Sequence, residues 1–426
     1  MEKRDDKKKV AIVGLGYVGL PLACLCARKG YAVLGIDINL EIVEKTNRGI
    51  SHIKDDELDR ALKEVKGKLV ATDKFDGIPN CGIVVICVPT PVDEKYKPDL
   101  RPLKSACNRI FTLIRKGQLI IVESTIYPGV IEEVVAPILE RSGMKAGSDF
   151  YLAHCPERID PGNRKYKVNN IPRVVGGVDK ESLKRAAGFY RSIIDAPVLE
   201  MSSVKAAEAV KIMENTFRDV NIAFVNELAK SFDKFGIDIS EVIKGASMKP
   251  FGFMPFYPGC GVGGHCIPVD PYYLIERAKG AGFDHRFLKL AREINHSMPE
   301  YTVELLESKL GDLKGEKVGV LGIAYKADVD DMRESPALDM IRILKERGAE
   351  ITVYDPNIPA KSDVSSLDEL LKKVDYIILA ADHKEFREMD PSRLKENGIE
   401  IVIDGRNCLD KEKIKALGIV YKGIGR

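Results

Sequence analysis

The sequence has no tryptophan, a single glutamine and six histidines in its 426 residues. It has no apolar run near the roughly twenty residues that a helix needs to cross a bilayer, which argues against a membrane-spanning protein. The N-terminal segment MEKRDDKKKV has no apolar core of the kind found in secretory signal peptides. We therefore expect a cytoplasmic protein.

The chain also has little net charge. Its 66 basic and 64 acidic residues leave a formal charge of +2, which gives no electrostatic reason to expect a nucleic-acid or anionic-membrane partner. The nine cysteines show no paired CxxC spacing, which favours reduced thiols over disulfides or a zinc site. We expect no bound metal. Five cysteines stand in apolar or helical contexts and are assigned to the core: Cys24, Cys26, Cys81, Cys87 and Cys107.

A glycine-rich turn, GLGYVG, follows a short apolar strand near the N-terminus and precedes a helical segment. In such a unit Gly14 makes the tight turn, Gly16 lets a pyrophosphate approach the backbone, and Gly19 lets helix and strand pack closely. The next strand, over 31–36, ends at Asp37, which can accept hydrogen bonds from ribose hydroxyls and would repel a 2′-phosphate. The pattern predicts a Rossmann domain that binds NAD rather than NADP. Its candidate cofactor-binding residues are Gly14, Gly16, Tyr17, Val18, Gly19 and Asp37.

Three further apolar strands each end in a polar or proline-containing loop. The carboxyl ends of parallel strands line the ligand crevice, so Thr90 and Thr125 are candidates for contact with cofactor or substrate. Both are also ordinary loop and capping residues. Glu157 and Arg158 follow the third strand, where a surface ion pair between neighbours is the plain alternative to a site.

A long helix is predicted over 202–235, because apolar residues such as Met213 and Phe217 recur at helical spacing. A helix of this length between two α/β units is expected to form a spine and a dimer surface. Lys211 and Asn215 stand four residues apart and share one of its faces. A solvated face is the alternative to a functional role for this pair.

The stretch PGCGVGGHCIPVDPYYL, over 258–274, is rich in glycine and proline, and we expect a loop because both residues disfavour helix and strand. Gly263 and Gly264 remove side-chain bulk just before Cys266, and Asp270 follows four residues later. This context is compatible with a nucleophilic thiol and with another core cysteine, and other segments must decide between the two.

A second α/β unit follows, but it lacks the glycine fingerprint, so a second dinucleotide is not expected. Lys326 and Arg333 in its first loop are candidates for holding a diphosphate. Alternatively, Lys326 and Arg333 only balance the negative charge of the three aspartates between them, Asp328, Asp330 and Asp331. The patterns together predict an α/β protein with an N-terminal Rossmann dinucleotide-binding domain (1–200), a central helical region with the spine helix (201–312) and a C-terminal Rossmann-like α/β domain (313–426).

Seven motifs over nearly the whole chain resemble the nucleotide-sugar 6-dehydrogenase family, also called the UDP-glucose/GDP-mannose dehydrogenase family. They are GLGYVGLP at Gly14, CVPTP at Cys87, ESTIYPG at Glu123, CPERIDPG at Cys155, VKIMENTFRDVNIAFVNEL at Val210, GVGGHCIPVDPYYL at Gly261 and YKADVDDMRESPA at Tyr325. The segment KPFGFMPFYPG, together with GGHC, is similar to members that act on UDP-N-acetylhexosamines, above all the UDP-N-acetylglucosamine 6-dehydrogenases. The UDP-N-acetylmannosamine enzymes share GVGGHCI, so the configuration at C2 stays open.

The resemblance implies a four-electron oxidation at C6 of a UDP-sugar, with two NAD molecules used in turn. It implies that Cys266 adds to the first-formed aldehyde, that the thiohemiacetal gives up a second hydride, and that water hydrolyses the thioester. Lys211 and Asn215 would stabilise the oxyanion, and Asp270 would orient Lys211 or water. Thr125 and Glu157 would handle the hydrolytic water. The catalytic set is thus Cys266, Lys211, Asn215, Asp270, Glu157 and Thr125.

Cofactor contacts are also expected from Thr90 and Thr125. The expected substrate contacts are Glu157, Arg158, Lys211, Asn215, Lys249, Phe256, Tyr257, Gly263, Lys326 and Arg333. The chain departs from the family pattern in two ways. Pro161 stands where some members have a second carboxylate. An arginine that reaches a neighbouring subunit's sugar in other members has no clear counterpart, and Lys249 is the nearest basic candidate. A homodimer or larger homo-oligomer is expected.

Other functions remain open. UDP-N-acetylmannosamine or UDP-glucose can replace UDP-N-acetylglucosamine as the substrate. A two-electron dehydrogenase of the β-hydroxyacid kind also joins a Rossmann domain to a helical region and uses a lysine and an asparagine. A catalytically silent nucleotide-binding scaffold is the remaining alternative. The ratio of NADH formed to substrate consumed separates a thioester mechanism from a two-electron enzyme.

Overall fold

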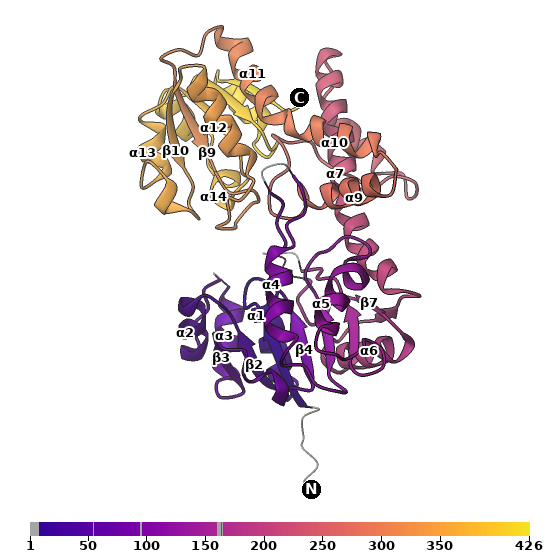
Figure 1. Ribbon diagram of the computed structural model, residues 1–426. Helices are drawn as coiled ribbons and strands as arrows, with labels where there is room; N and C mark the ends of the chain where they lie inside the picture. The colour runs from indigo at the N-terminus through magenta and orange to yellow at the C-terminus, as the bar shows by residue number, and fades with distance from the viewer. Residues whose placement is uncertain (1–7, 54, 94–95, 160–162, 164) are drawn as a thin grey trace. The chain divides into compact units, whose positions relative to one another are not determined.

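The computed structural model describes residues 8–426 except 54, 94–95, 160–162 and 164. The chain divides into two compact units. The first comprises Met1–Glu214 and Tyr272–Phe283, and the second comprises Asn215–Pro271 and Asp284–Arg426. Figure 1 colours the chain from indigo at β1 to yellow at the last strand.

The first unit is built on an eight-stranded sheet in the order β3-β2-β1-β4-β5-β6-β7-β8. Its strands are β1 (Lys9–Val13), β2 (Ala32–Ile36), β3 (Leu69–Thr72), β4 (Ile83–Ile86), β5 (Leu119–Val122), β6 (Tyr151–His154), β7 (Arg173–Gly177) and β8 (Val198–Glu200). The strands β1 to β6 are parallel, whereas β7 runs antiparallel to β6. The order 3-2-1-4-5-6 is that of a dinucleotide-binding sheet. The predicted Rossmann fold is confirmed, and the strand order reverses between β1 and β4, where such sheets bind their ligand.

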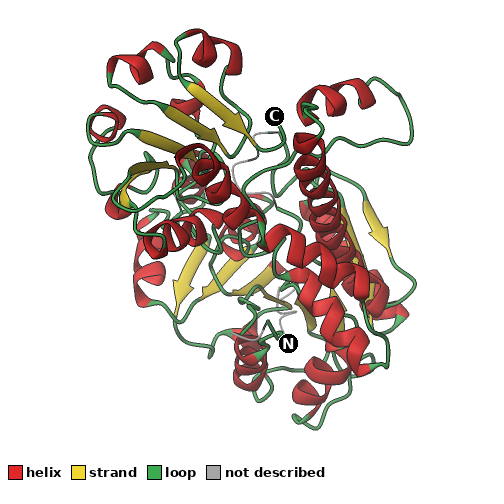
Figure 2. Cartoon of the chain, turned by 90° about the horizontal axis from the view of Figure 1, so that it is seen from above, coloured by secondary structure: helices red, strands yellow, loops and turns green. Residues whose placement is uncertain are grey.

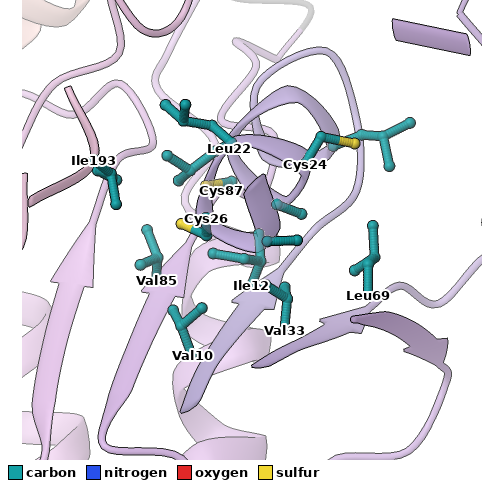
Figure 3. Packing of buried hydrophobic residues seen from close by; sticks show 14 of the residues in the cluster. Val10, Ile12, Leu22, Cys24, Cys26, Val33, Leu69, Val85, Cys87 and Ile193 are labelled. Carbon is teal, nitrogen blue, oxygen red and sulfur yellow. The ribbon is translucent and has the colours of Figure 1, made fainter. Parts of the chain in front are cut away.

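Helices pack against both faces of this sheet, and its central strands are accordingly mostly apolar rather than alternating. Figure 2 colours the helices red and the strands yellow. The helices are α1 (Gly19–Arg28), α2 (Leu40–Arg48), α3 (Asp56–Glu64), α4 (Arg101–Ile110), α5 (Ala136–Glu140) and α6 (Lys180–Ile193), with the short 3₁₀-helix η2 (Ile78–Asn80) and the π-helix η3 (Ile131–Val135). Ile12 and Val85 point from the strands toward Leu22 and Cys26 of α1 (Figure 3). Burial of each such aliphatic side chain contributes about 1.5–3 kcal/mol. This packing holds the start of α1 close to the end of β1.

The second unit contains a five-stranded parallel sheet in the order β10-β9-β11-β12-β13. Its strands are β9 (Lys317–Leu321), β10 (Glu350–Tyr354), β11 (Tyr376–Leu379), β12 (Ile401–Asp404) and β13 (Val420–Gly423). The accompanying helices are α12 (Pro336–Glu346), α13 (Leu367–Leu371), α14 (Lys384–Arg387), α15 (Ser392–Glu396) and α16 (Lys411–Ala416), with the turn η4 (Pro359–Lys361). Counted from β9, the order is 2-1-3-4-5, the other common doubly wound arrangement. The predicted C-terminal Rossmann-like domain is therefore present.

The turn after β9 repeats the geometry of the turn after β1. Gly14 and Gly322 have φ of 93° and 85°, which a residue with a Cβ rarely adopts. Their N–H groups donate to the carbonyl oxygens of Ile36 and Tyr354 at 2.7 and 2.8 Å. Each turn is thereby tied to the end of the neighbouring strand.

The acids at the ends of β2 and β10 differ in accessibility. Asp37 is half-buried. Asp355 is fully buried, and its Oδ2 lies 3.1 Å from Nε2 of His383 and accepts hydrogen bonds from the N–H groups of Ile323 and Ala324. The carboxylate of Asp355 therefore bonds groups of its own domain, whereas the carboxylate of Asp37 is accessible to a ligand.

The remaining helices are α7 (Val204–Lys234), α8 (Ile239–Ala246), α9 (Asp270–Gly280), α10 (Arg286–His296) and α11 (Met298–Leu310). The long helix predicted over 202–235 is α7. The prediction of a loop over all of 258–274 is wrong at its end, because α9 begins at Asp270. Pro271 lies in the first turn of α9, where its missing N–H leaves no intrahelical bond unmade. No helix of the described chain is long and apolar enough to span a membrane.

Candidate active site

The glycine turn after β1 has the shape that a dinucleotide phosphate requires. A Cβ on Gly19 would lie 1.8 Å from the oxygen of Gly14, and one on Gly14 would lie 2.7 Å from the oxygen of Cys87. A Cβ on Gly16 would meet nothing within 4 Å. The turn is thus closed on its protein side and open at Gly16, with the N-terminus of α1 beside it. These residues fit NAD.

Asp37 is held in place by the backbone around it. Its Oδ2 accepts a hydrogen bond from the N–H of Leu15 at 2.8 Å, and its Oδ1 accepts one from the N–H of Asn39 at 2.9 Å. A carboxylate has lone pairs beyond these two bonds. The acid is therefore oriented by the turn and retains capacity for ribose hydroxyls.

The structure brings Thr90 and Thr125 together where β4 and β5 end. Oγ1 of Thr90 donates to the carbonyl oxygen of Thr125 at 2.7 Å. The carbonyl oxygen of Thr90 accepts a hydrogen bond from the hydroxyl of Tyr273 on α9. Sequence reasoning did not single out Tyr273, because its partner lies 183 residues away along the chain.

Lys211 and Glu157 are both buried, at 6% and 8% exposure, and Nζ lies 3.8 Å from Oε2. This excludes a solvated helix face for Lys211. Arg158 donates to the carboxylate of Glu214 and to the carbonyl oxygen of Pro172. The alternative of a mere surface pair between Glu157 and Arg158 is therefore wrong.

In the second unit, Asn215 and Asp270 are buried together. Nδ2 of Asn215 donates to Oδ2 of Asp270 at 2.5 Å. Asp270 is the first residue of α9, where the helix dipole favours a carboxylate. Its N–H donates to the carbonyl oxygen of Cys266 at 2.8 Å. The backbone of Cys266 is thereby fixed to the start of α9.

Cys266 is half-buried, whereas seven of the nine cysteines are buried. Burial raises the pKa of the thiols of Cys24, Cys107 and Cys155 to about 12. Such thiols are almost fully protonated at neutral pH, and only the thiolate is a strong nucleophile. The assignment of Cys24, Cys26, Cys81, Cys87 and Cys107 to the core is confirmed.

The loop before Cys266 packs against the loop that carries Lys326 and Arg333. A Cβ on Gly263 would lie 2.6 Å from the oxygen of Glu334, and one on Gly264 would lie 2.8 Å from the ring of Tyr325. The N–H of Gly264 donates to the carbonyl oxygen of Arg333 at 3.0 Å. The two glycines thus serve loop packing within the protein.

Arg333 is exposed and forms a two-pronged contact with Asp331, with Nε 2.9 Å from Oδ1 and Nη2 2.5 Å from Oδ2. Its Nη2 also lies 3.3 Å from Nδ1 of His265. Lys326 is half-buried in the same loop. A diphosphate bound by Arg333 would therefore compete with the carboxylate of Asp331 for the guanidinium.

The residues after α8 lie on a largely exposed loop. Nζ of Lys249 lies 4.9 Å from the centre of the Phe251 ring. The ring of Phe256 meets that of Phe217 edge-on with centroids 5.8 Å apart, and Tyr257 is exposed. Pro161 lies outside the described residues.

The family descriptions that match this chain cover most of it. The NAD-binding domain of the UDP-glucose/GDP-mannose dehydrogenase family matches residues 8–194, its central domain matches 205–297, and its UDP-binding domain matches 319–411.

Several relatives are 38% identical to the chain, and two of them are named for a UDP-sugar. One is the UDP-N-acetyl-D-mannosamine dehydrogenase of Pyrococcus horikoshii, with 98% of this chain and 99% of the relative aligned. The other is the UDP-N-acetyl-D-glucosamine 6-dehydrogenase of Pseudomonas aeruginosa, with 95% and 98% aligned.

A solved structure of the UDP-D-ManNAc dehydrogenase from Pyrococcus horikoshii superposes with a TM-score of 0.92 at 38% identity, over 98% of this chain and 99% of that chain. The agreement in fold, in three successive domains and in identity over nearly the full length identifies the chain as a member of the UDP-glucose/GDP-mannose dehydrogenase family, the NAD-dependent nucleotide-sugar 6-dehydrogenases.

Proposed function

We propose that the protein oxidises the C6 hydroxyl of a UDP-N-acetylhexosamine to the carboxylate in two NAD-dependent steps, with UDP-N-acetylglucosamine as the favoured substrate. The observation that carries the proposal is the half-buried Cys266, whose backbone is anchored to Asp270 at the start of α9. A thiol is needed only if the aldehyde is oxidised further at the same site. Relatives named for the N-acetylmannosamine and the N-acetylglucosamine nucleotides are equally identical to the chain, so both substrates belong in the test.

The proposed reaction begins with loss of the C6 hydroxyl proton and of a hydride from C6. NAD held at the glycine turn after β1 would supply the hydride acceptor for each of the two oxidation steps. Sγ of Cys266 then adds to the aldehyde carbon, and loss of the second hydride gives a thioester. Water attacks the thioester carbon, the C–S bond breaks, and the thiol is restored with release of the acid.

Lys211 and Asn215 support the charge that develops on the sugar oxygen. Both are buried, and a buried ammonium or amide donor stabilises an oxyanion more strongly than an exposed one. Asp270 orients Asn215 through their 2.5 Å hydrogen bond. Glu157, whose Oε2 lies 3.8 Å from Nζ of Lys211, takes a proton from the hydrolytic water, and Thr125 also handles this water.

The domain boundaries 1–200, 201–312 and 313–426 are part of the proposal, with the UDP group held by the C-terminal domain through Lys326 and Arg333. We further propose a cytoplasmic enzyme that forms a homodimer through α7.

The test is the NADH yield per substrate at completion, with excess NAD and separately with UDP-N-acetylglucosamine, UDP-N-acetylmannosamine and UDP-glucose. Two equivalents from one nucleotide sugar support the thioester route and identify the substrate. One equivalent points to a two-electron dehydrogenase, and none with any of the three favours the scaffold.

A matched pair of variants isolates the thiol. Cys266→Ser is expected to make no acid while remaining folded, because a serine hydroxyl is a far weaker nucleophile than a thiolate. Cys408→Ser alters the other half-buried cysteine and should retain full activity. Normal acid production by Cys266→Ser would refute the nucleophile assignment.

A further inference from the structure

A fully buried ion pair lies beneath the loop that carries Glu157. Glu123, directly after β5, and Arg173, the first residue of β7, are 0% and 1% exposed, and Oε2 lies 3.7 Å from Nη1. Oε1 of Glu123 accepts a hydrogen bond from the hydroxyl of Tyr190 at 2.5 Å. The proposed reaction assigns no role to this pair.

The guanidinium of Arg173 is poorly satisfied for a buried charge. None of its three nitrogens has a hydrogen-bond partner within the described part of the chain, and neither does Oε2 of Glu123. Burial opposes the charge on Arg173, but nearby acidic groups, foremost Glu123, keep its pKa above the usual value. A charge pair of this kind adds little stability compared with apolar side chains of similar size, so its presence calls for another reason.

Two backbone contacts connect this pair to the Glu157 loop. The N–H of Glu157 donates to the carbonyl oxygen of Glu123 at 3.3 Å. The guanidinium of Arg158 donates to the carbonyl oxygen of Pro172, the neighbour of Arg173, at 2.9 Å. Any displacement of the pair therefore moves the segment that holds the Glu157 carboxylate.

The pair also acts on Glu157 through charge. Among the described residues, Nζ of Lys211 on α7 lies 3.8 Å from the Glu157 carboxylate, and Arg173 of β7 and Cys87 at the end of β4 interact with that carboxylate electrostatically. Charges buried in a low-dielectric interior influence each other over longer distances than charges in water. The positive charge of Arg173 favours the ionised form of Glu157.

From these contacts we infer that Arg173 and Glu123 are positioning residues for Glu157, which hold its loop and set the pH range over which its carboxylate is ionised. This inference rests on the proposed function, in which Glu157 takes a proton from the hydrolytic water. Arg173 and Glu123 touch neither substrate nor cofactor in this scheme.

The experiment measures hydrolysis of the Cys266 thioester against pH, by quenched flow and mass spectrometry of the peptide that contains Cys266. The hydrolysis rate of wild type should fall at low pH as Glu157 becomes protonated. Glu157→Gln should remove this acid limb of the pH profile. Glu123→Gln leaves an uncompensated guanidinium, which cannot release its proton, so the limb should move to lower pH by about one unit. Arg173→Gln removes the positive charge, and the limb should move about one unit to higher pH.

Two controls separate positioning from a purely structural role. Arg173→Lys keeps the charge and should retain a limb near that of wild type. In a Glu157→Gln background, Glu123→Gln should leave the profile unchanged. If Arg173→Gln does not fold, as judged by circular dichroism and NAD affinity, Glu123→Gln and Arg173→Lys still decide the question.

Limbs that coincide for wild type and Glu123→Gln, or shifts of the same sign for Glu123→Gln and Arg173→Gln, would overturn the inference. Failure of the proposed function has a different signature, because wild type then forms no Cys266 thioester with any nucleotide sugar. The thioester can also form and hydrolyse with a pH profile that has no acid limb, or with one that Glu157→Gln does not remove. Either result would likewise overturn the role of the pair.

Discussion

At the scale of single residues, burial decides what chemically identical side chains can do. The thiols of Cys24 and Cys107 are buried and protonated, whereas Cys266 is half-buried in a loop fixed to α9. Lys211 and Asn215 lie on a helix with an exposed apolar face, yet both are buried beside acids.

Asp37 allows a residue-scale prediction about the cofactor. We expect Asp37→Ser to lower kcat/KM for NAD about tenfold or more, because hydrogen bonds to a charged acceptor are lost. The same change should raise kcat/KM for NADP, since repulsion of the 2′-phosphate disappears. Steady-state kinetics with both cofactors measure the ratio. An unchanged ratio would show that Asp37 serves only the backbone of Leu15 and Asn39.

His154 allows a prediction about acid stability. Burial lowers the pKa of its imidazole to about 3, although the backbone of Val122 works in the opposite direction. An unfolded histidine titrates near 6.5, so the native state loses stability as pH falls through the window from about 6.5 to 3. At pH 5 the loss should be about 2 kcal/mol relative to pH 8.

His154→Leu removes the titrating group and should abolish that part of the pH dependence. The measurement is urea unfolding of wild type and variant at pH 8 and pH 5, with the difference between the two proteins taken at each pH. An equal acid sensitivity in both proteins would contradict the prediction.

At the scale of elements, the loop before Cys266 owes its shape to its neighbour rather than to its own sequence. Gly263 and Gly264 leave room for Glu334 and Tyr325 of the loop after β9. Since glycine by itself confers flexibility, the order of this segment comes from the packing and from the hydrogen bond of Gly264 to Arg333.

We expect Gly263→Ala to reduce acid production by about tenfold or more, because a misplacement of about 1 Å is enough to disrupt a reacting geometry. The added methyl would lie 2.6 Å from the oxygen of Glu334, a backbone atom that cannot rotate away. NAD affinity should not change. Gly188→Ala in α6 is the matched control: its Cβ meets nothing within 4 Å, and alanine favours helix by about 1 kcal/mol. Equal activity of the two variants would argue against a role for the packing.

At the scale of the whole molecule, α7 carries large apolar side chains that the described residues cover only in part. Met213, Phe217 and Phe224 are 72%, 46% and 55% exposed and share one face by their spacing. Contiguous apolar surface of this kind usually marks a protein–protein contact. The proposed homodimer would cover it.

Phe217→Asp combined with Phe224→Asp should therefore shift the protein from dimer to monomer, because a desolvated charge at an interface core is costly. Sedimentation velocity measures the change. Leu199→Asp on β8 is the control, since Leu199 is 61% exposed and lies on another element. A sedimentation coefficient that is the same for wild type and the double variant would reject α7 as the dimer surface.

The sequence by itself determined the local elements and the family. The turn at Gly14, the acid at Asp37 and the helix α7 follow from spacing rules that act within one or two turns of chain. Motifs from residue 14 to residue 337 were enough to indicate the three-part α/β fold and the nucleotide-sugar dehydrogenase family, both of which are confirmed.

The tertiary structure alone decided which of these residues meet. The partners Lys211 and Glu157 are 54 positions apart, and the pair of Arg173 and Glu123 is 50 positions apart. No local pattern encodes such pairs, because they depend on which strands become neighbours and on how much water the packed sheet excludes. The sequence thus specified the chemical groups, and burial and strand order decided how those groups are paired.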